Sequence, residues 1–192
     1  MSVFAYKLSV ILLSISMLIF ISGCSTTSDS TTSQKEMSPV SAEKSVAMEL
    51  YEVHHDGRIH VFYNRALYQE FLSLGETPYR LTRIGAGPNG ETMVFGITKK
   101  DKKKASDVAA VKLYDGGISA DGAFYAEMRR HERIYVFSSF EDMQPVRQFG
   151  HPNFFYSEIG AGPQGETVVF VMNSKNKKKR PSALIAKYMS LK

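Results

Sequence analysis

The stretch that decides the fold occurs twice in this chain. It reads IGAGPNGETMVF at Ile84–Phe95 and IGAGPQGETVVF at Ile159–Phe170, so that ten of the twelve positions are identical. Upstream of it, Arg58–Phe62 returns as Arg133–Phe137, and the offset is 75 residues in both cases. A constant offset without gaps indicates that one structural unit has been duplicated.

One unit of this length is too small to be stable alone. A chain of about 75 residues buries only roughly 60% of its unfolded surface. The whole chain of 192 residues is 43% hydrophobic and 22% charged, which is the composition of a globular protein. We therefore expect repeat 1, residues 46–116, and repeat 2, residues 117–192, to pack against each other as one pseudo-symmetric body.

Each repeat begins with the pattern of a hairpin followed by a helix. In repeat 1 the Asp-Gly pair at 56–57 lies between two alternating segments, and glycine tolerates the positive φ of a tight turn. Asn64 is suited to cap a helix, in which Leu67, Phe71 and Leu74 form one apolar stripe.

The duplicated glycine-rich stretch connects two strand-like segments, 79–84 and 92–98 in repeat 1 and 154–159 and 167–173 in repeat 2. Its glycines and proline suit a bent hairpin tip. Each repeat is thus predicted as strand–strand–helix–strand–strand followed by a short helix. In repeat 2 the first helix should break or kink at Pro145, because proline lacks an N–H group. The predicted class is α+β, with a mostly antiparallel sheet.

Residues 1–23 have the pattern of a signal segment. Lys7 precedes the apolar run Leu8–Ile21, which suits the core of a signal peptide and is short for a membrane span of ~20 residues. The run ends in Ile21-Ser22-Gly23-Cys24, which resembles the lipobox of bacterial lipoproteins. The resemblance implies cleavage before Cys24, a diacylglycerol thioether on its sulfur and acylation of its new amine. An ordinary secretory signal with an incidental cysteine is the alternative.

Cysteine usage and the segment that follows agree with lipidation. Cys24 is the only cysteine of the chain, and an odd cysteine in an exported protein calls for an explanation. Residues 24–45 are rich in Ser and Thr, and we interpret them as a lipidated, flexible tether. In the lipoprotein family, Asp directly after the cysteine is linked to retention at the inner membrane. Ser25 therefore points to the outer membrane of a Gram-negative cell, facing the periplasm.

The glycine-rich loops and the glutamates at their exits are candidates for chemistry. Such loops can cradle phosphate, but phosphate loops lead into a helix, whereas both flanks here are strand-like. Glu91 and Glu166 recur at the loop exits. They would serve as acid and base if the repeats brought them together. We favour the alternative that each accepts backbone N–H groups within its own turn.

His54, His55 and His60 suggest copper or zinc binding, and a copper-type metal-handling lipoprotein of the periplasm is one alternative function. Two arginines and a tyrosine take their places in repeat 2, so the duplicated architecture does not need these histidines. We therefore predict no metal site and no cofactor. No motif of nucleophilic catalysis is present, and a hydrolase with an unrecognised site between the repeats is the other alternative.

The chain has a net charge of +5, and its positive charge gathers in two equivalent loops. The lysines in question are Lys102, Lys103, Lys104, Lys177, Lys178 and Lys179. They are either solvated connections or an anion-binding surface for anionic lipid or another envelope polyanion.

These features predict a non-enzymatic outer-membrane lipoprotein that presents a duplicated α+β module in the periplasm, for binding or for envelope maintenance. Its expected partners are the membrane, through the lipid on Cys24, and an anionic lipid or polyanion, through the lysines. The sequence identifies no protein partner.

We expect the mature protein to begin at Cys24 and to carry lipid there, because a lipobox precedes it and the chain has no other cysteine. Intact-mass spectrometry of protein extracted from membranes with detergent measures both properties. Cys24→Ala should abolish acylation and cleavage at this site. A mature protein that is cleaved elsewhere, or whose Cys24 is unmodified, would contradict the prediction.

Overall fold

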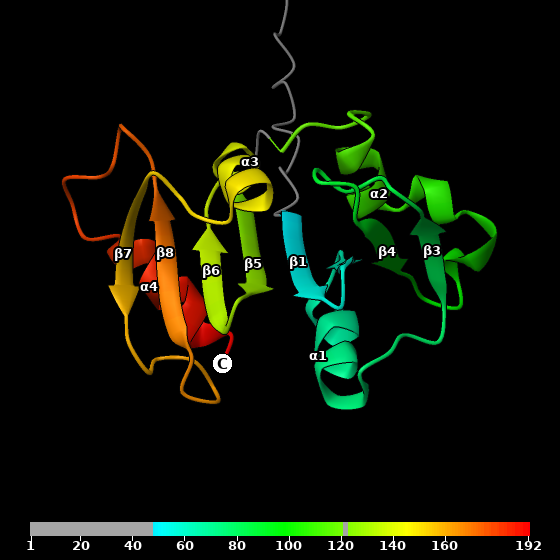
Figure 1. The fold of residues 1–192 in the computed structure, drawn as a ribbon, viewed down its shortest axis with the longest axis horizontal. Helices are drawn as coiled ribbons and strands as arrows, with labels where there is room; N and C mark the ends of the chain where they lie inside the picture. Colours follow the sequence, from blue (N-terminus) through cyan, green and yellow to red (C-terminus); the bar gives the residue numbers. More distant parts are fainter. Residues whose placement is uncertain (1–47, 121–122) are drawn as a thin grey trace, which may run out of the picture. The chain divides into compact units, whose positions relative to one another are not determined.

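The two repeats contain the same order of strands and helices. The structure, a computed structural model, describes residues 48–120 and 123–192, so the signal segment, Cys24 and the whole predicted tether lie outside the described residues. Repeat 1 contributes β1 (Met48–His55), β2 (Arg58–Phe62), α1 (Arg65–Leu74), β3 (Arg80–Arg83), β4 (Thr92–Gly96), the short 3-10 turns η1 (Asp101–Lys103) and η2 (Ala105–Asp107), and α2 (Ala109–Tyr114). Repeat 2 contributes β5 (Phe124–Arg130), β6 (Arg133–Phe137), α3 (Phe140–Phe149), β7 (Phe154–Glu158), β8 (Thr167–Met172) and α4 (Ser182–Ser190) (Figure 1).

The predicted α+β class is confirmed. The eight strands form one mixed sheet in the order β3-β4-β2-β1-β5-β6-β8-β7. The four pairings within hairpins are antiparallel, as expected. The other three, β1–β5, β2–β4 and β6–β8, are parallel. None of the helices in the described part of the chain is long and apolar enough to cross a membrane.

The first hairpin of each repeat closes through two residues with positive φ. In repeat 1 these are Asp56, at 49°, and Gly57, at 69°. In repeat 2 they are His131, at 51°, and Glu132, at 59°. Two successive left-handed residues match the right-handed twist of the flanking strands, which is why the tight turn persists in repeat 2 without glycine.

The helix that follows each hairpin is capped as the sequence predicts, but Pro145 does not break it. The Asn64 side chain accepts a hydrogen bond from the Leu67 N–H at 3.0 Å at the start of α1. Helix α3 continues through Pro145 to Phe149. An interior proline costs about 3 kcal/mol. Burial of the neighbouring Met143 and Val146, both 0% exposed, offsets that cost. Of the predicted break or kink, the break is therefore wrong.

The pairing of β1 with β5 joins the two repeats. The strands run parallel, and Met48 lies opposite Phe124. The sequence separation of this pair exceeds the repeat offset of 75 by one residue. Because successive side chains of a strand point to opposite faces, this shift places equivalent residues on opposite faces of the sheet. Tyr51 accordingly packs on one face and its counterpart Ala126 on the other.

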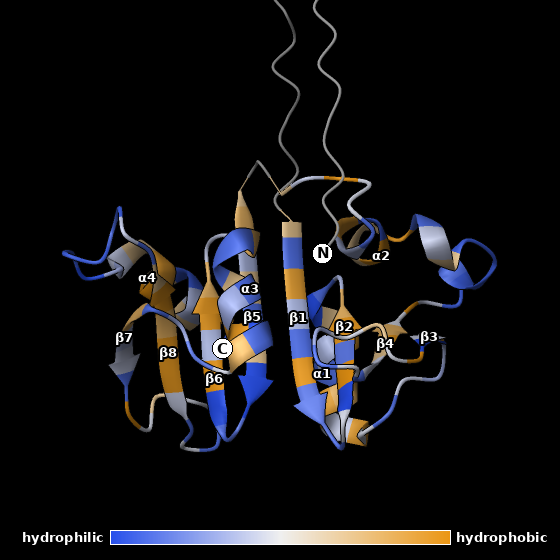
Figure 2. Ribbon diagram, turned by 45° about the horizontal axis from the view of Figure 1, so that its top comes forward, coloured by the Kyte–Doolittle hydropathy of each residue, from blue (hydrophilic) through white to orange (hydrophobic). Residues whose placement is uncertain are grey.

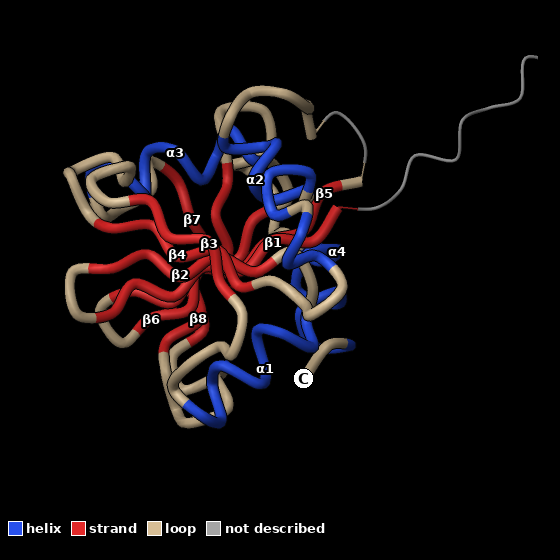
Figure 3. Tube along the Cα trace, turned by 90° about the vertical axis from the view of Figure 1, so that its right-hand side faces the viewer, coloured by secondary structure: helices blue, strands red, loops and turns tan. Residues whose placement is uncertain are grey.

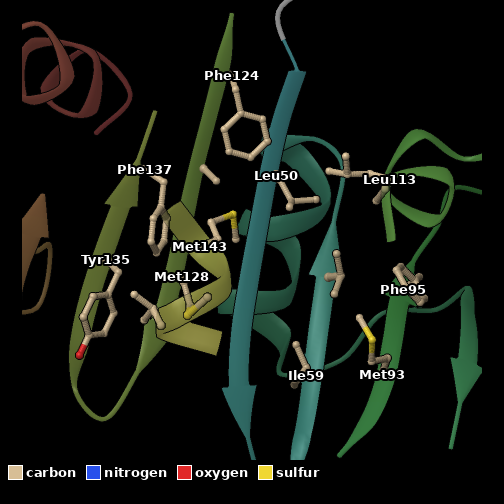
Figure 4. Close-up of a cluster of buried hydrophobic side chains, with 14 of the residues drawn as sticks. Leu50, Ile59, Met93, Phe95, Leu113, Phe124, Met128, Tyr135, Phe137 and Met143 are labelled. Carbon is tan, nitrogen blue, oxygen red and sulfur yellow. The ribbon is translucent and has the colours of Figure 1, made fainter. Parts of the chain in front are cut away.

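Each face of the sheet carries one helix from each repeat, as Figure 3 shows. Helices α2 and α3 cover one face and enclose what we call the α2/α3 core. Figure 4 shows part of this core. Its fully buried members include Leu50 and Val111 of repeat 1 and Met128, Met143 and Val146 of repeat 2.

Helices α1 and α4 cover the other face and enclose the α1/α4 core. Its most buried members include Tyr51, Phe62 and Tyr68 of repeat 1 and Val136 and Phe170 of repeat 2. Both repeats therefore contribute to both cores, so neither core is complete without the other repeat.

We expect Met143→Ala to destabilise the protein by about 2–5 kcal/mol, because it leaves a cavity in the α2/α3 core. Met189→Ala on α4 is the matched control, since Met189 is 49% exposed, and it should cost less than about 1 kcal/mol. Urea unfolding measures both free energies. Equal losses in the two variants would contradict this account of the core.

Candidate functional site

Glu91 and Glu166 close the glycine-rich turns in which they lie. The Asn89 N–H donates to Glu91 Oε2 at 2.8 Å, and the Gln164 N–H donates to Glu166 Oε2 at 2.7 Å. Burial opposes ionisation, but these backbone hydrogen bonds outweigh it and hold the pKa of both carboxyls below the ordinary value. The preferred interpretation, that each glutamate accepts N–H groups of its own turn, is confirmed.

The structure does not bring the three histidines together. His54 Nε2 lies 3.0 Å from Glu52 Oε2, and the exposed His55 lies 3.1 Å from its neighbour Asp56. His60 stacks against Phe71 of α1, with ring centroids 4.5 Å apart, and thus belongs to the opposite face from Glu52. Within residues 48–120 and 123–192, no group of three or more His, Cys, Asp or Glu side chains is arranged to hold a metal ion.

His60 instead borders a polar cavity of about 570 Å³ between α1, β2, β3 and β4. Burial, together with the nearby charges of Arg58, His55 and Arg80, lowers its pKa to about 4. The imidazole is therefore neutral at physiological pH. In repeat 2 the larger Tyr135 takes its position and donates to the Gly150 carbonyl at 3.3 Å.

The two lysine loops form separate patches rather than one surface. One loop follows β4 and the other follows β8, and four strands lie between β4 and β8. At ~4.8 Å per strand this separation is about 24 Å. The hydrophilic loops accordingly lie on the two flanks of the sheet (Figures 1 and 2). Lys177 Nζ packs 4.0 Å from the Phe154 ring centroid, and Lys102 Nζ packs 5.7 Å from that of Tyr79.

Two buried glutamates, Glu52 on β1 and Glu127 on β5, are the charged residues that sequence reasoning missed. They are 0% and 4% exposed and occupy equivalent positions, 75 residues apart. A signal was present in the sequence, because a carboxylate recurs at the repeat offset inside two apolar strands. A charge that is this deeply buried requires partners.

Glu52 is held in a closed ion pair within the α2/α3 core. Arg147 Nε of α3 lies 3.2 Å from Glu52 Oε1, and both side chains are almost fully buried. The guanidinium of Arg147 also stacks on the Tyr114 ring, 4.3 Å from its centroid. Arg147 and His54, whose Nε2 lies 3.0 Å from Glu52 Oε2, are thus the partners of this carboxylate.

Glu127 lies on the other face, in a hydrogen-bonded network that reaches a cavity of about 170 Å³. The Tyr125 hydroxyl donates to Oε1 at 2.7 Å, and the Tyr68 hydroxyl donates to Oε2 at 3.3 Å. Arg129 Nε donates to the Tyr68 hydroxyl at 2.8 Å, and its Nη1 donates to Glu166 Oε1. Burial dominates over these contacts and raises the pKa of Glu127.

An apolar groove of about 630 Å³ lies at the starts of β1 and β5. Helix α4 and the loop before it form one wall. The apolar lining residues include Met48, Phe124, Tyr125, Val171, Pro181 and Leu184. The polar lining residues are Glu49, Ser138, Asn176, Arg180, Ser182 and Lys187. Its size and lining are those of a ligand site.

Small residues keep this groove open in repeat 2. Ser138 lines it, and the counterpart of Ser138 in repeat 1 is Tyr63. Tyr63 packs against both cores and donates to Asp101 Oδ2 at 2.5 Å. Ala183 likewise lines the groove, whereas its counterpart Val108 is buried in the α2/α3 core. The same fold therefore accepts a large side chain where repeat 2 has a groove.

Comparison of the chain with protein-family models, with curated proteins and with solved structures finds no match.

We expect Glu127→Gln to change how stability depends on pH. Folding raises the pKa of Glu127 above its ordinary value of 4.5. At a pH between the ordinary pKa and the raised pKa, the folded protein therefore binds more protons than the unfolded chain. In that window stability falls as pH rises, and removing the carboxyl should remove this part of the fall. Urea unfolding from about pH 4.5 upward measures the slope. Glu70→Gln, on the exposed side of α1, is the control and should follow the wild-type curve. Parallel curves for wild type and Glu127→Gln would contradict the assignment.

Proposed function

We propose that this protein is a lipid-anchored, non-enzymatic binding module of the bacterial envelope, and that its groove takes the acyl chain of an anionic amphiphile. The observation that carries the proposal is the apolar groove beside Ser138, at a position where the other repeat has Tyr63. Because the fold tolerates a tyrosine there, the open space in repeat 2 is not a requirement of folding.

The charge around the groove favours an anionic headgroup. Lys187 and Arg180 line it, although Arg180 Nη2 already donates to Glu158 Oε1 at 2.9 Å. The loop that leads to α4 also carries Lys175, Lys177, Lys178 and Lys179. The acidic lining residue Glu49 is already engaged, because it accepts from the Tyr51 hydroxyl at 3.0 Å and lies 3.9 Å from Lys187 Nζ. Near an anionic surface each lysine contributes about 1 kcal/mol.

The lipobox supplies the location that such a ligand requires. Lipid on Cys24 would hold the module at the outer membrane, facing the periplasm. A flexible tether of about twenty residues would let it move within roughly 25 Å of the lipid headgroups. The groove lies at the start of β1, the strand by which the tether continues into the sheet.

One observation favours the alternative of a hydrolase, namely a carboxyl with a raised pKa in a cavity between the repeats. An acid–base pair needs a second carboxyl beside Glu127. The duplicated residue, Glu52, cannot be that carboxyl, because it lies on the opposite face of the sheet from Glu127. The hydrogen-bonding partners of Glu127 are Tyr68 and Tyr125, and burial raises the pKa of both phenols, which makes them poor nucleophiles. We therefore favour binding.

We expect Ser138→Tyr to weaken binding of a fatty-acid probe such as parinaric acid by about tenfold or more, because the side chain of repeat 1 then fills the groove. Ser73→Tyr, at an exposed position of α1, is the matched control and should leave binding unchanged. Probe fluorescence measures the affinity.

Changing Lys175, Lys177, Lys178 and Lys179 to Gln should weaken binding of the same probe, and added salt should reduce the difference from wild type. Absence of binding to the wild-type protein, or equal binding to wild type and Ser138→Tyr, would contradict the proposal.

A further inference from the structure

The side chains around Glu127 differ in kind from their counterparts around Glu52. The polar groups are Arg65, Tyr68, Tyr125, Arg129 and Tyr188. The residues 75 positions away are, in the same order, Phe140, Met143, Leu50, His54 and Leu113. Four of the five counterparts are apolar, so the fold itself does not require a polar shell at this place.

One member of the polar shell does not serve Glu127. Glu52 is contacted by Arg147 and His54, and Glu127 accepts the hydroxyls of Tyr68 and Tyr125. The hydroxyl of Tyr188 has no hydrogen-bond partner among the described residues, although the residue is only 3% exposed. A buried polar group without a partner is costly. A leucine at position 188, like its counterpart Leu113, would avoid that cost. Tyr188 lines the cavity beside Glu127, where its hydroxyl can meet a ligand.

The cavity presents positive charge at its mouth. Arg65 comes from α1 and is 29% exposed at its side chain, and Arg129 comes from β5 and is 19% exposed. Arg65 Nη1 lies 4.0 Å from Glu127 Oε1, beyond hydrogen-bond distance. Arg65 also interacts with the Tyr51 hydroxyl, and the remaining N–H groups of its guanidinium can donate to another acceptor. Lys192 lines the same cavity, where its Nζ donates to the Ala161 carbonyl.

We propose that this cavity, the Glu127 pocket, is a second binding site that takes a small oxyanion, a carboxylate or a phosphate group, between Arg65, Arg129 and the Tyr188 hydroxyl. The volume of about 170 Å³ suits such a group and not an acyl chain. Planar guanidinium groups bind carboxylate and phosphate through paired hydrogen bonds. The site is distinct from the groove and does not depend on the function proposed for it.

Protonation of Glu127 is linked to this binding. The ionisable groups that line the pocket are Arg65, Tyr68, Glu127, Arg129, Tyr188 and Lys192. Three more lie behind them and act on Glu127 or its partners, namely Tyr51 of β1, Tyr125 of β5 and Glu166 before β8. Arg129 is paired with Glu166, and an ionised Glu127 balances Arg65. A protonated Glu127 leaves the charge of Arg65 free for the anion. The affinity for a fully ionised anion should therefore fall as pH rises through the pKa of Glu127.

Titration of the full chain with acetate and with methyl phosphate, followed by amide chemical shifts in NMR spectra, tests the proposal and separates the two sources of oxyanion. We expect Arg65→Phe and Tyr188→Leu, which install the residues of the other repeat, to weaken binding about tenfold, or ~1.4 kcal/mol. Tyr188→Phe removes only the hydroxyl and keeps the packing, and it should weaken binding as well. Arg58→Gln, which alters the separate cavity beside His60, is the control and should bind as wild type does.

The pH dependence supplies a readout that a merely structural role would not change. In wild type the affinity for acetate should decrease as pH rises from the ordinary carboxyl pKa of 4.5 through the raised pKa of Glu127, and in Glu127→Gln this decrease should be absent. If neither anion binds, the proposal is wrong. Binding that survives both Arg65→Phe and Tyr188→Phe would equally overturn it. Loss of parinaric acid binding in Ser138→Tyr, with anion binding unchanged, would show that the two sites are independent.

Discussion

The structure depends on one constraint, the parallel pairing of β1 with β5 at a register one residue longer than the repeat offset. Because side chains alternate along a strand, that single residue turns the second repeat over relative to the first. The helices that follow β2 and β6 then lie on opposite faces, and the closing helix of each repeat lies on the same face as the first helix of the other repeat. Two small units, each marginal alone, thereby complete two cores.

The inversion also gives each duplicated residue two different environments. Glu52 and Glu127 come from the same position of the unit, yet one meets Arg147 in an apolar core and the other meets tyrosines beside a cavity. Tyr63 and Ser138 differ in the same way, since one fills its position and the other borders the groove. One repeat therefore serves as an internal reference for what the fold alone requires of the other.

Both proposed sites lie along α4. Leu184 and Lys187 of this helix line the groove, and Tyr188 lines the Glu127 pocket. Tyr125 joins the two, because it lines the groove while its hydroxyl donates to Glu127. Buried polar groups of this kind are costly unless they are fully paired. They gather on the α1/α4 face, where α1 of repeat 1 meets β5 and α4 of repeat 2, and this distinguishes that face from the α2/α3 face.

The sequence by itself determined the local structure. The hairpins, the Asn64 cap and the role of Glu91 and Glu166 in their turns follow from groups within a few residues of one another, so spacing and residue type suffice. The sequence could not give the parallel pairings, the burial that carries α3 through Pro145 or the distance between the lysine loops. These depend on contacts between residues far apart in the chain. The candidate sites belong to that second group, because Glu127 acquires its partners only when α1 of one repeat packs against β5 of the other.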